Sequence, residues 1–384
     1  MVIGGLGQQE RSPSLNPVKI FLIILLAIPF AGCWDVGEID QKDMILAIGL
    51  DAVSDTFIRS TIQIPLTEST LPPAAGHGAS QEKKFYTIGT VARTILGAAS
   101  VQQSNTPRTL ITGHIKSVLI NENLARRGIK RYLDNLASTP KTPRSANIFI
   151  CRQPAGEILK YIPAQSIVPG IGFSQQMESP LKRDLTYPIQ LWNFFQRLDE
   201  PGMDPYAPVI SFQKENETFE ITGLAVFRHD RLVGFLDPEQ TRVFGIMTGK
   251  INGGYLEAPM GSNQFVTYRM VTAKSRITLQ DQKPFHIKVK IKVSGTLSEI
   301  AGRREISDPE YRQIKEQTRR YIEKQCRKTI RLIQSWEADI LDFGLECRNQ
   351  LPERFDPRTW HRRFKEAKVK VVVDFGIVRS GLYH

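Results

Sequence analysis

The chain has 384 residues, of which 41% are hydrophobic and 23% charged, with a mean hydropathy of −0.24. This composition excludes a disordered or fibrous chain, and the length suggests two or three domains. The formal net charge of +12 is concentrated in residues 271–384, which carry 25 basic and 15 acidic side chains, whereas residues 33–270 are nearly neutral. A basic region of this kind indicates an acidic partner, which can be nucleic acid, an anionic membrane surface or an acidic protein.

Residues 1–32 have the pattern of a lipoprotein signal peptide. Lys19 precedes an apolar run over residues 20–28, and an Ala-Gly pair stands directly before Cys33. The run is shorter than the roughly 20 apolar residues that a membrane-spanning helix needs. The small residues before the cysteine resemble a bacterial lipobox, so we expect a diacylglycerol on Cys33. An ordinary signal peptide with an incidental cysteine is the alternative.

Lipidation at Cys33 would place the mature chain outside the cytoplasm. Intracellular nucleic acid is then excluded as a partner, so we expect no nucleic-acid contact. An anionic membrane leaflet or an acidic membrane protein becomes the expected partner of the basic region.

Residues 33–200 predict an N-terminal α/β domain, because strands and helices alternate along this segment. The expected strands cover residues 44–50, 57–64, 114–120 and 146–151, and the expected helices residues 88–99, 121–136, 155–161 and 188–198. Segments 67–84 and 162–185 are rich in turn-forming residues and predict loops.

A boundary is expected at residues 199–205, which contain two prolines and a glycine. Residues 206–267 then predict a small β-rich middle domain. Its expected strands cover residues 209–212, 219–227, 232–235 and 242–247, with a hairpin turn at residues 229–230.

Residues 268–384 predict a basic α+β C-terminal domain. Apolar residues alternate with Lys288, Lys290 and Lys292 over positions 285–293, so one face of this expected strand is apolar and the other basic. A second such strand begins at residue 368. One interpretation is a half-buried antiparallel sheet whose lysines face water and discourage edge pairing. The other makes these three lysines the candidate contact with an acidic surface.

A long amphipathic helix lies between the two basic strands. Ser307 and Glu310 form a capping-box pattern at its start, and apolar residues follow at helical spacing towards Gly344, the expected stop. The fold class expected for the whole chain is therefore mixed α/β, with three domains and a long helix packed on a basic-faced sheet.

No pattern for catalysis, a cofactor or a metal is present in the sequence. The six histidines show no HxxxH or HExxH grouping, and no GxSxG motif occurs. The segment 245–250 has one residue too few for a phosphate loop and lacks the following Ser or Thr. Cys151, Cys326 and Cys347 have no metal-type spacing. A Cys326–Cys347 disulfide is possible, but buried thiols are the expected state.

Several segments together resemble the Ger(x)C family of spore germination lipoproteins. The segment 31–39, Ala-Gly-Cys-Trp-Asp-Val-Gly-Glu-Ile, is similar to the start of the mature family members. Further similar segments are residues 108–114, 121–128, 223–227, 231–234, 248–250 and 342–344, together with Trp360 and the lysine-rich final strand.

The resemblance implies a non-enzymatic lipoprotein subunit of a nutrient germinant receptor. Such a subunit would work beside two integral membrane subunits, of A and B type, on the extracytoplasmic face of the inner spore membrane. A three-domain α/β fold and the lipid on Cys33 are also implied. Two alternatives remain open from the residues alone: a lipoprotein that captures the nutrient itself in a cleft, and a lipid-anchored cell-wall hydrolase.

Overall fold

The largest of the three sheets among the described residues has eight strands in the order β10-β9-β8-β7-β6-β2-β3-β4. These strands are β2 (Ala47–Ala52), β3 (Ile58–Pro65), β4 (Phe85–Ala92), β6 (Ser117–Asn121), β7 (Asn147–Cys151), β8 (Tyr206–Gln213), β9 (Thr218–Arg228) and β10 (Arg231–Leu236). The central pairs β2–β6, β6–β7 and β7–β8 are parallel, and the outer pairs are antiparallel. Two further strands, β1 (Lys42–Met44) and β5 (Thr109–Ile111), pair with each other.

The computed structural model describes residues 41–66, 84–163, 168–178, 184–261, 264–280, 285–300 and 307–378. The predicted signal peptide, Cys33 and most of the predicted loop 67–84 lie outside these residues. The prediction of a loop over 162–185 was wrong in part, because residues Pro169–Glu178 form helix α6. The part of the chain from Asp43 onward forms one compact unit.

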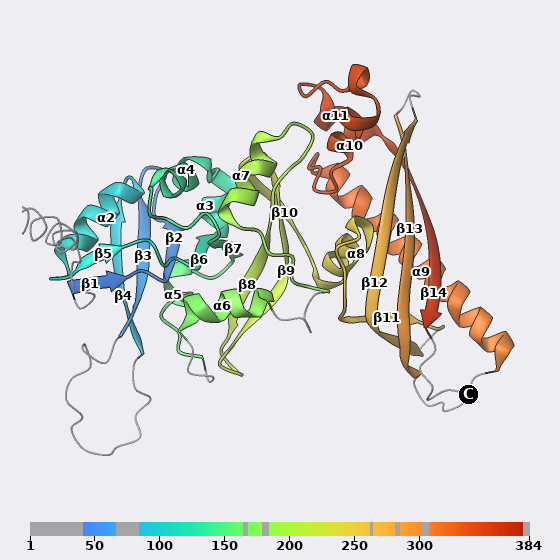
Figure 1. The fold of residues 1–384 in the computed structure, drawn as a ribbon, viewed down its shortest axis with the longest axis horizontal. Helices are drawn as coiled ribbons and strands as arrows, with labels where there is room; N and C mark the ends of the chain where they lie inside the picture. Colours follow the sequence, from blue (N-terminus) through green and yellow to red (C-terminus); the bar gives the residue numbers. More distant parts are fainter. Residues whose placement is uncertain are drawn as a thin grey trace, which may run out of the picture. The chain divides into compact units, whose positions relative to one another are not determined.

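Helices cover both faces of the eight-stranded sheet (Figure 1). Val118 and Ile120 of β6 belong to one buried cluster and Leu119 to another, because successive side chains of a strand point to opposite faces. The first cluster includes residues of α2 (Ile95–Ser104), α3 (Glu122–Arg127), α4 (Lys130–Ser138) and α7 (Leu191–Asp199), and the second those of α5 (Ala155–Ile158) and α6 (Pro169–Glu178). This double coverage explains why every residue of the central strands β6 and β7 is buried.

Two helix predictions in this region were wrong. Residues 88–92 belong to strand β4, since the β-branched residues Ile88, Thr90 and Val91 pair with β3. Helix α2 begins only after the cap Thr94. The predicted helix over 121–136 is two helices, because Gly128 adopts a φ of 102° and ends α3.

The second sheet has four strands in the order β11-β12-β13-β14, with α9 packed along it (Figure 1). The elements are β11 (Tyr255–Pro259), β12 (Phe265–Gln280), β13 (His286–Ile300), α9 (Asp308–Ser335) and β14 (Lys368–Val378). The half-buried antiparallel sheet expected in one interpretation is in fact mixed: β11–β12 and β12–β13 are antiparallel, whereas the two basic strands β13 and β14 are parallel. The connection through α9 brings the chain back to the same end of the sheet before β14 begins.

The predicted start of the long helix is confirmed, but the helix ends earlier than predicted. A capping box joins Ser307 and Glu310, but α9 stops at Ser335 rather than at Gly344. The chain then turns through residues with positive φ, Glu337 and Asp342, into α10 (Phe343–Gln350), the 3-10 helix η5 (Pro352–Arg354) and α11 (Trp360–Glu366).

The predicted middle segment 206–267 has no sheet of its own. Strands β8, β9 and β10 continue the eight-stranded sheet, whereas β11 joins the four-stranded sheet. The strand predicted over 242–247 was wrong, since these residues lie in α8 (Pro238–Thr248), which Asp237 and Gln240 start with a capping box. The division of the chain into three domains stays a prediction.

Two further observations concern the described residues. No helix among them is both long enough and apolar enough to cross a membrane. Cys151, Cys326 and Cys347 are buried thiols and form no disulfide with one another.

Candidate functional site

Seven basic side chains lie on the outer face of the four-stranded sheet, and we call this set the basic face. Its members are Lys274, Arg276, Lys288, Lys290, Lys292, Lys368 and Lys370. The alternation predicted for β13 is confirmed: Ile287, Val289, Ile291 and Val293 are buried beneath α9, whereas Lys290 and Lys292 are exposed and Lys288 is half-buried. The structure therefore brings the three predicted lysines together and adds four further bases from β12 and β14.

The register places bases of like charge directly opposite one another. Lys292 pairs with Lys274, Lys290 with Arg276, and Lys288 with Lys370. Like charges at directly opposed positions destabilise a sheet. Exposure of this face to water would not by itself require bases to lie opposite other bases.

The bases of the basic face make no ion pair with any described residue, and Asp374 is the acidic side chain placed opposite Lys292. On helix α9, by contrast, charged side chains do form ion pairs. Glu316 and Glu323 form ion pairs with neighbouring arginines at 2.7 Å, and hydrogen bonds from Arg319 and Arg320 lower the pKa of Glu316 to about 2. The positive charge of the basic face thus remains available to an external acidic group.

A second group of polar side chains joins the eight-stranded and the four-stranded sheets, and no sequence pattern predicted it. Arg197 of α7 is almost fully buried and donates from Nε to the Asp204 carbonyl at 2.9 Å. Its guanidinium also donates to the Ile340 carbonyl and pairs with Asp342 at 2.5 Å. The predicted boundary 199–205 is therefore a packed joint between the sheets.

The joint continues through the buried carboxylate of Asp339. Asp339 accepts hydrogen bonds from the Gly344 amide at 2.7 Å and from Trp360 Nε1 at 2.9 Å. Burial nevertheless raises the pKa of Asp339 to about 7. Gly202 has a φ of 91°, and a Cβ there would lie 2.6 Å from the Gly344 carbonyl carbon, so the two backbones touch at this point.

Asp204 and two histidines meet at the solvent side of the joint. His361 Nε2 lies 3.1 Å from Asp204 Oδ2, and the ring of His229 packs against that of His361 with centroids 4.7 Å apart. The hydrogen bond to Asp204 raises the pKa of His361, whereas burial and the neighbouring His361 lower the pKa of His229. No sequence signal reveals this group, because its members come from three distant segments.

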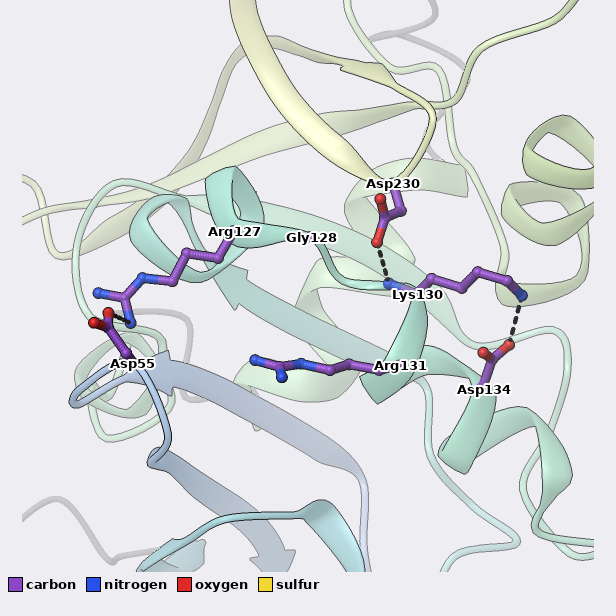
Figure 2. Close-up of a pocket in the computed structure, with 7 residues that line it drawn as sticks. All are labelled: Asp55, Arg127, Gly128, Lys130, Arg131, Asp134 and Asp230. Atoms are coloured by element: carbon purple, nitrogen blue, oxygen red, sulfur yellow. Dashed lines mark hydrogen bonds and ion pairs between the residues drawn. The ribbon is translucent and has the colours of Figure 1, made fainter.

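A pocket of about 490 Å³ lies beside α3 and α4 (Figure 2). Its charges are mostly paired: Arg127 with Asp55 at 3.3 Å, and Lys130 with Asp134 at 3.0 Å. Figure 2 shows Arg131 lying between these two pairs. Its guanidinium stacks over the Tyr132 ring at 4.6 Å and has no carboxylate partner in the described part of the chain.

A second pocket, of about 680 Å³, lies between α7, β8 and the loop after α8. Tyr187, Trp192 and Tyr206 supply aromatic walls, and Lys250 donates to the Tyr206 hydroxyl at 2.9 Å. The segment 245–250 covers the last turn of α8 and the first residues of this loop. Gly245 lies within helix α8, where a Cβ would meet the Tyr187 hydroxyl, so this glycine serves packing and not phosphate binding.

Comparison with known proteins gives two family models that together cover most of the chain. The model of the spore germination protein N-terminal domain matches residues 35–212. The model described as spore germination B3/GerAC like, C-terminal, matches residues 222–381.

Individual relatives are similar over nearly their whole length. The chain is 26% identical to the putative spore germination protein YfkR of Bacillus subtilis (strain 168), covering 95% of this chain and 97% of that protein. It is 21% identical to the spore germination protein GerQC of Bacillus cereus, covering 94% and 98%. Among solved structures, the GerBC protein matches with a TM-score of 0.56 at 17% identity, covering 86% of this chain and 96% of that one, which supports the mixed α/β fold.

Proposed function

The chain belongs to the Ger(x)C family of spore germination proteins, and from this premise we propose that it is the lipoprotein subunit of a nutrient germinant receptor. In this proposal it has no catalytic activity and works with two integral membrane subunits at the extracytoplasmic face of the inner spore membrane. Relatives named as germination proteins B3, KC and A3 support a role within a multi-subunit receptor.

Attachment to the membrane would come from a diacylglycerol on Cys33. The support is the signal-peptide pattern of residues 1–32, with small residues directly before the cysteine. Two acyl chains suffice for stable anchoring, so the basic face is not needed for retention at the membrane. Its charge is then available for recognition.

The observation that carries the proposed contact is the basic face with its unpaired, like-charged cross-strand neighbours. We propose that Lys288, Lys290 and Lys292 contact an acidic surface of the receptor's membrane subunits or of the anionic leaflet. Such a contact would offset the repulsion within the sheet and would weaken as the salt concentration rises.

The anchor is tested by the intact mass of the protein extracted from membranes, compared with that of Cys33→Ala. We expect a mature N-terminus at residue 33 that carries a diacylglycerol mass, and no such mass in the variant. An uncleaved or unmodified wild-type N-terminus would contradict the anchor. The family membership would be unaffected by that result.

Nutrient capture by this subunit is a second candidate, favoured by Arg131 in the charged pocket of Figure 2. A free amino acid could place its carboxylate on this guanidinium. Thermal unfolding with a panel of amino acids and sugars tests it, comparing Arg131→Gln with Arg358→Gln, a change at an exposed arginine outside the pocket. A stabilising nutrient whose effect is lost only in Arg131→Gln would support capture, and the absence of any shift would exclude it.

A further inference from the structure

Three potential metal ligands from distant parts of the chain meet at the joint. Asp204 precedes β8, His229 lies in the turn between β9 and β10, and His361 is in the first turn of α11. One ligand atom from each of these side chains lies within 4.8 Å of the other two. The three residues therefore converge on one point between the eight-stranded sheet and the helices that pack on the four-stranded sheet.

The spacing of the ligand atoms agrees with a tetrahedral ion. Bonds of about 2.1 Å to nitrogen and oxygen place two ligands of such an ion roughly 3.3 Å apart. His361 Nε2 is 3.1 Å from Asp204 Oδ2 and 3.3 Å from Oδ1, so this pair already has the required separation. His229 is exposed on its hairpin, and its ligand nitrogen lies within 4.8 Å of the other two ligand atoms, so its ring must move closer when an ion binds.

The carboxylate of Asp204 is held in place by the backbone. Asp204 is 1% exposed; its Oδ1 accepts from the His229 amide at 2.9 Å and its Oδ2 from the Asp339 amide at 2.7 Å. Each oxygen retains a lone pair for a further partner. Hydrogen bonds of this kind orient metal ligands in proteins. The amide of His229 therefore positions one ligand while its ring supplies another.

An ion pair between His361 and Asp204 would explain why these two side chains lie together, but it would not explain the position of His229. It leaves the His229 ring against a charged imidazole, with centroids 4.7 Å apart. A bound cation accounts for all three, because it takes both imidazoles in their neutral form and is balanced by the carboxylate.

We propose that Asp204, His229 and His361 bind one divalent transition-metal ion of the Zn²⁺ class. Two imidazoles and one carboxylate suit zinc and its neighbours, whereas Mg²⁺ and Ca²⁺ prefer oxygen ligands alone. The exposed side of His229 leaves the fourth position open to water. The ion links the hairpin between β9 and β10 to helix α11 and so fastens the two sheets together.

The test uses the full-length chain in detergent, without an affinity tag and freed of metal by chelation. Titration with Zn²⁺ by calorimetry should show one ion per chain, and Co²⁺ should produce the visible absorption of a tetrahedral site. Zn²⁺ should also raise the melting temperature. In His229→Ala, we expect at least a tenfold weaker affinity and no increase in melting temperature.

His229→Ala is the decisive variant because no described residue accepts or donates a hydrogen bond to its ring, so the variant should fold normally. The matched control is His114→Ala, another exposed histidine in a different part of the fold. Equal Zn²⁺ affinity in wild type, His229→Ala and His114→Ala would mean adventitious binding only and would overturn the proposal. So would the absence of Co²⁺ absorption in the wild-type chain.

Discussion

At the scale of single residues, the joint contains the three least exposed charged side chains in the described part of the chain. Arg197, Asp204 and Asp339 are each at most 3% exposed. Buried charges are tolerated only when they are paired and hydrogen-bonded. Their partners come from the loop between α9 and α10, from α10 and α11, and from the turn between β9 and β10. These residues therefore determine how the segment after α9 meets the eight-stranded sheet.

Arg197→Met removes the central cation of this network. Asp342 then loses its partner, and the carbonyls of Asp204 and Ile340 lose their donor. Breaking a buried pair by removing one member costs about 3 kcal/mol. We expect that decrease in the free energy of unfolding, measured by urea denaturation.

Arg348→Met is the control for this change. Arg348 also bridges the joint, through Glu200, but its side chain is 38% exposed. Exposed pairs contribute less than about 1 kcal/mol. A similar loss of stability in both variants would contradict the assignment of Arg197 as the central cation of the joint.

The buried cysteines permit a chemical test. Burial raises the pKa of the Cys151 thiol, and that of Cys326 to about 12, so neither forms the reactive thiolate at neutral pH. In a Cys33→Ala chain, we expect no reaction with a thiol reagent in the folded state and three equivalents per chain after unfolding. Fast labelling of one thiol in the folded protein would show that the core opens locally.

At the scale of helices and strands, local sequence patterns predicted the structure correctly wherever interactions between residues close in sequence determine it. The strand over 285–293, the Asn121 cap of α3 and the capping box at Ser307 are all confirmed. They depend on alternation and capping, which act within a few residues.

The errors have a common origin in long-range contacts. Segment 242–247 is helical because α8 packs between the two sheets, which a short apolar pattern cannot reveal. The parallel pairing of β13 with β14 follows from the path of α9. The site at Asp204, His229 and His361 combines three segments whose proximity exists only in the folded chain.

Gly245→Ala tests the packing of α8. A Cβ at this position would lie 1.6 Å from the Tyr187 hydroxyl oxygen, so the helix or the tyrosine must move. Overpacking of this kind costs about 1–3 kcal/mol. Thermal unfolding should show the loss of stability.

The control for α8 is Gly376→Ala in β14, where the nearest atom would be 3.9 Å from the new Cβ. A change within about 0.5 kcal/mol is expected there. If Gly245→Ala were equally mild, the close approach of Tyr187 to α8 would be contradicted.

At the scale of the whole molecule, charge and anchoring are separated along the chain. The expected lipid site stands at residue 33, whereas the excess positive charge belongs to residues 271–384. Within that region α9 covers the apolar face of the sheet and leaves the basic face open. A lipoprotein built in this way can be retained by one end and can recognise an acidic surface with the other.

The central claim is that the basic face contacts acidic membrane components of the receptor. The most direct measurement is co-purification of the two integral membrane subunits with Lys288→Glu/Lys290→Glu/Lys292→Glu, over a series of salt concentrations. The matched control is Lys315→Glu/Lys324→Glu/Lys328→Glu, which makes the same change in net charge at exposed positions on α9. We predict that the first variant loses its partners and the second retains them in the wild-type, salt-sensitive manner. Equal recovery of the partners by wild type and both variants, with unchanged salt sensitivity, would contradict the account.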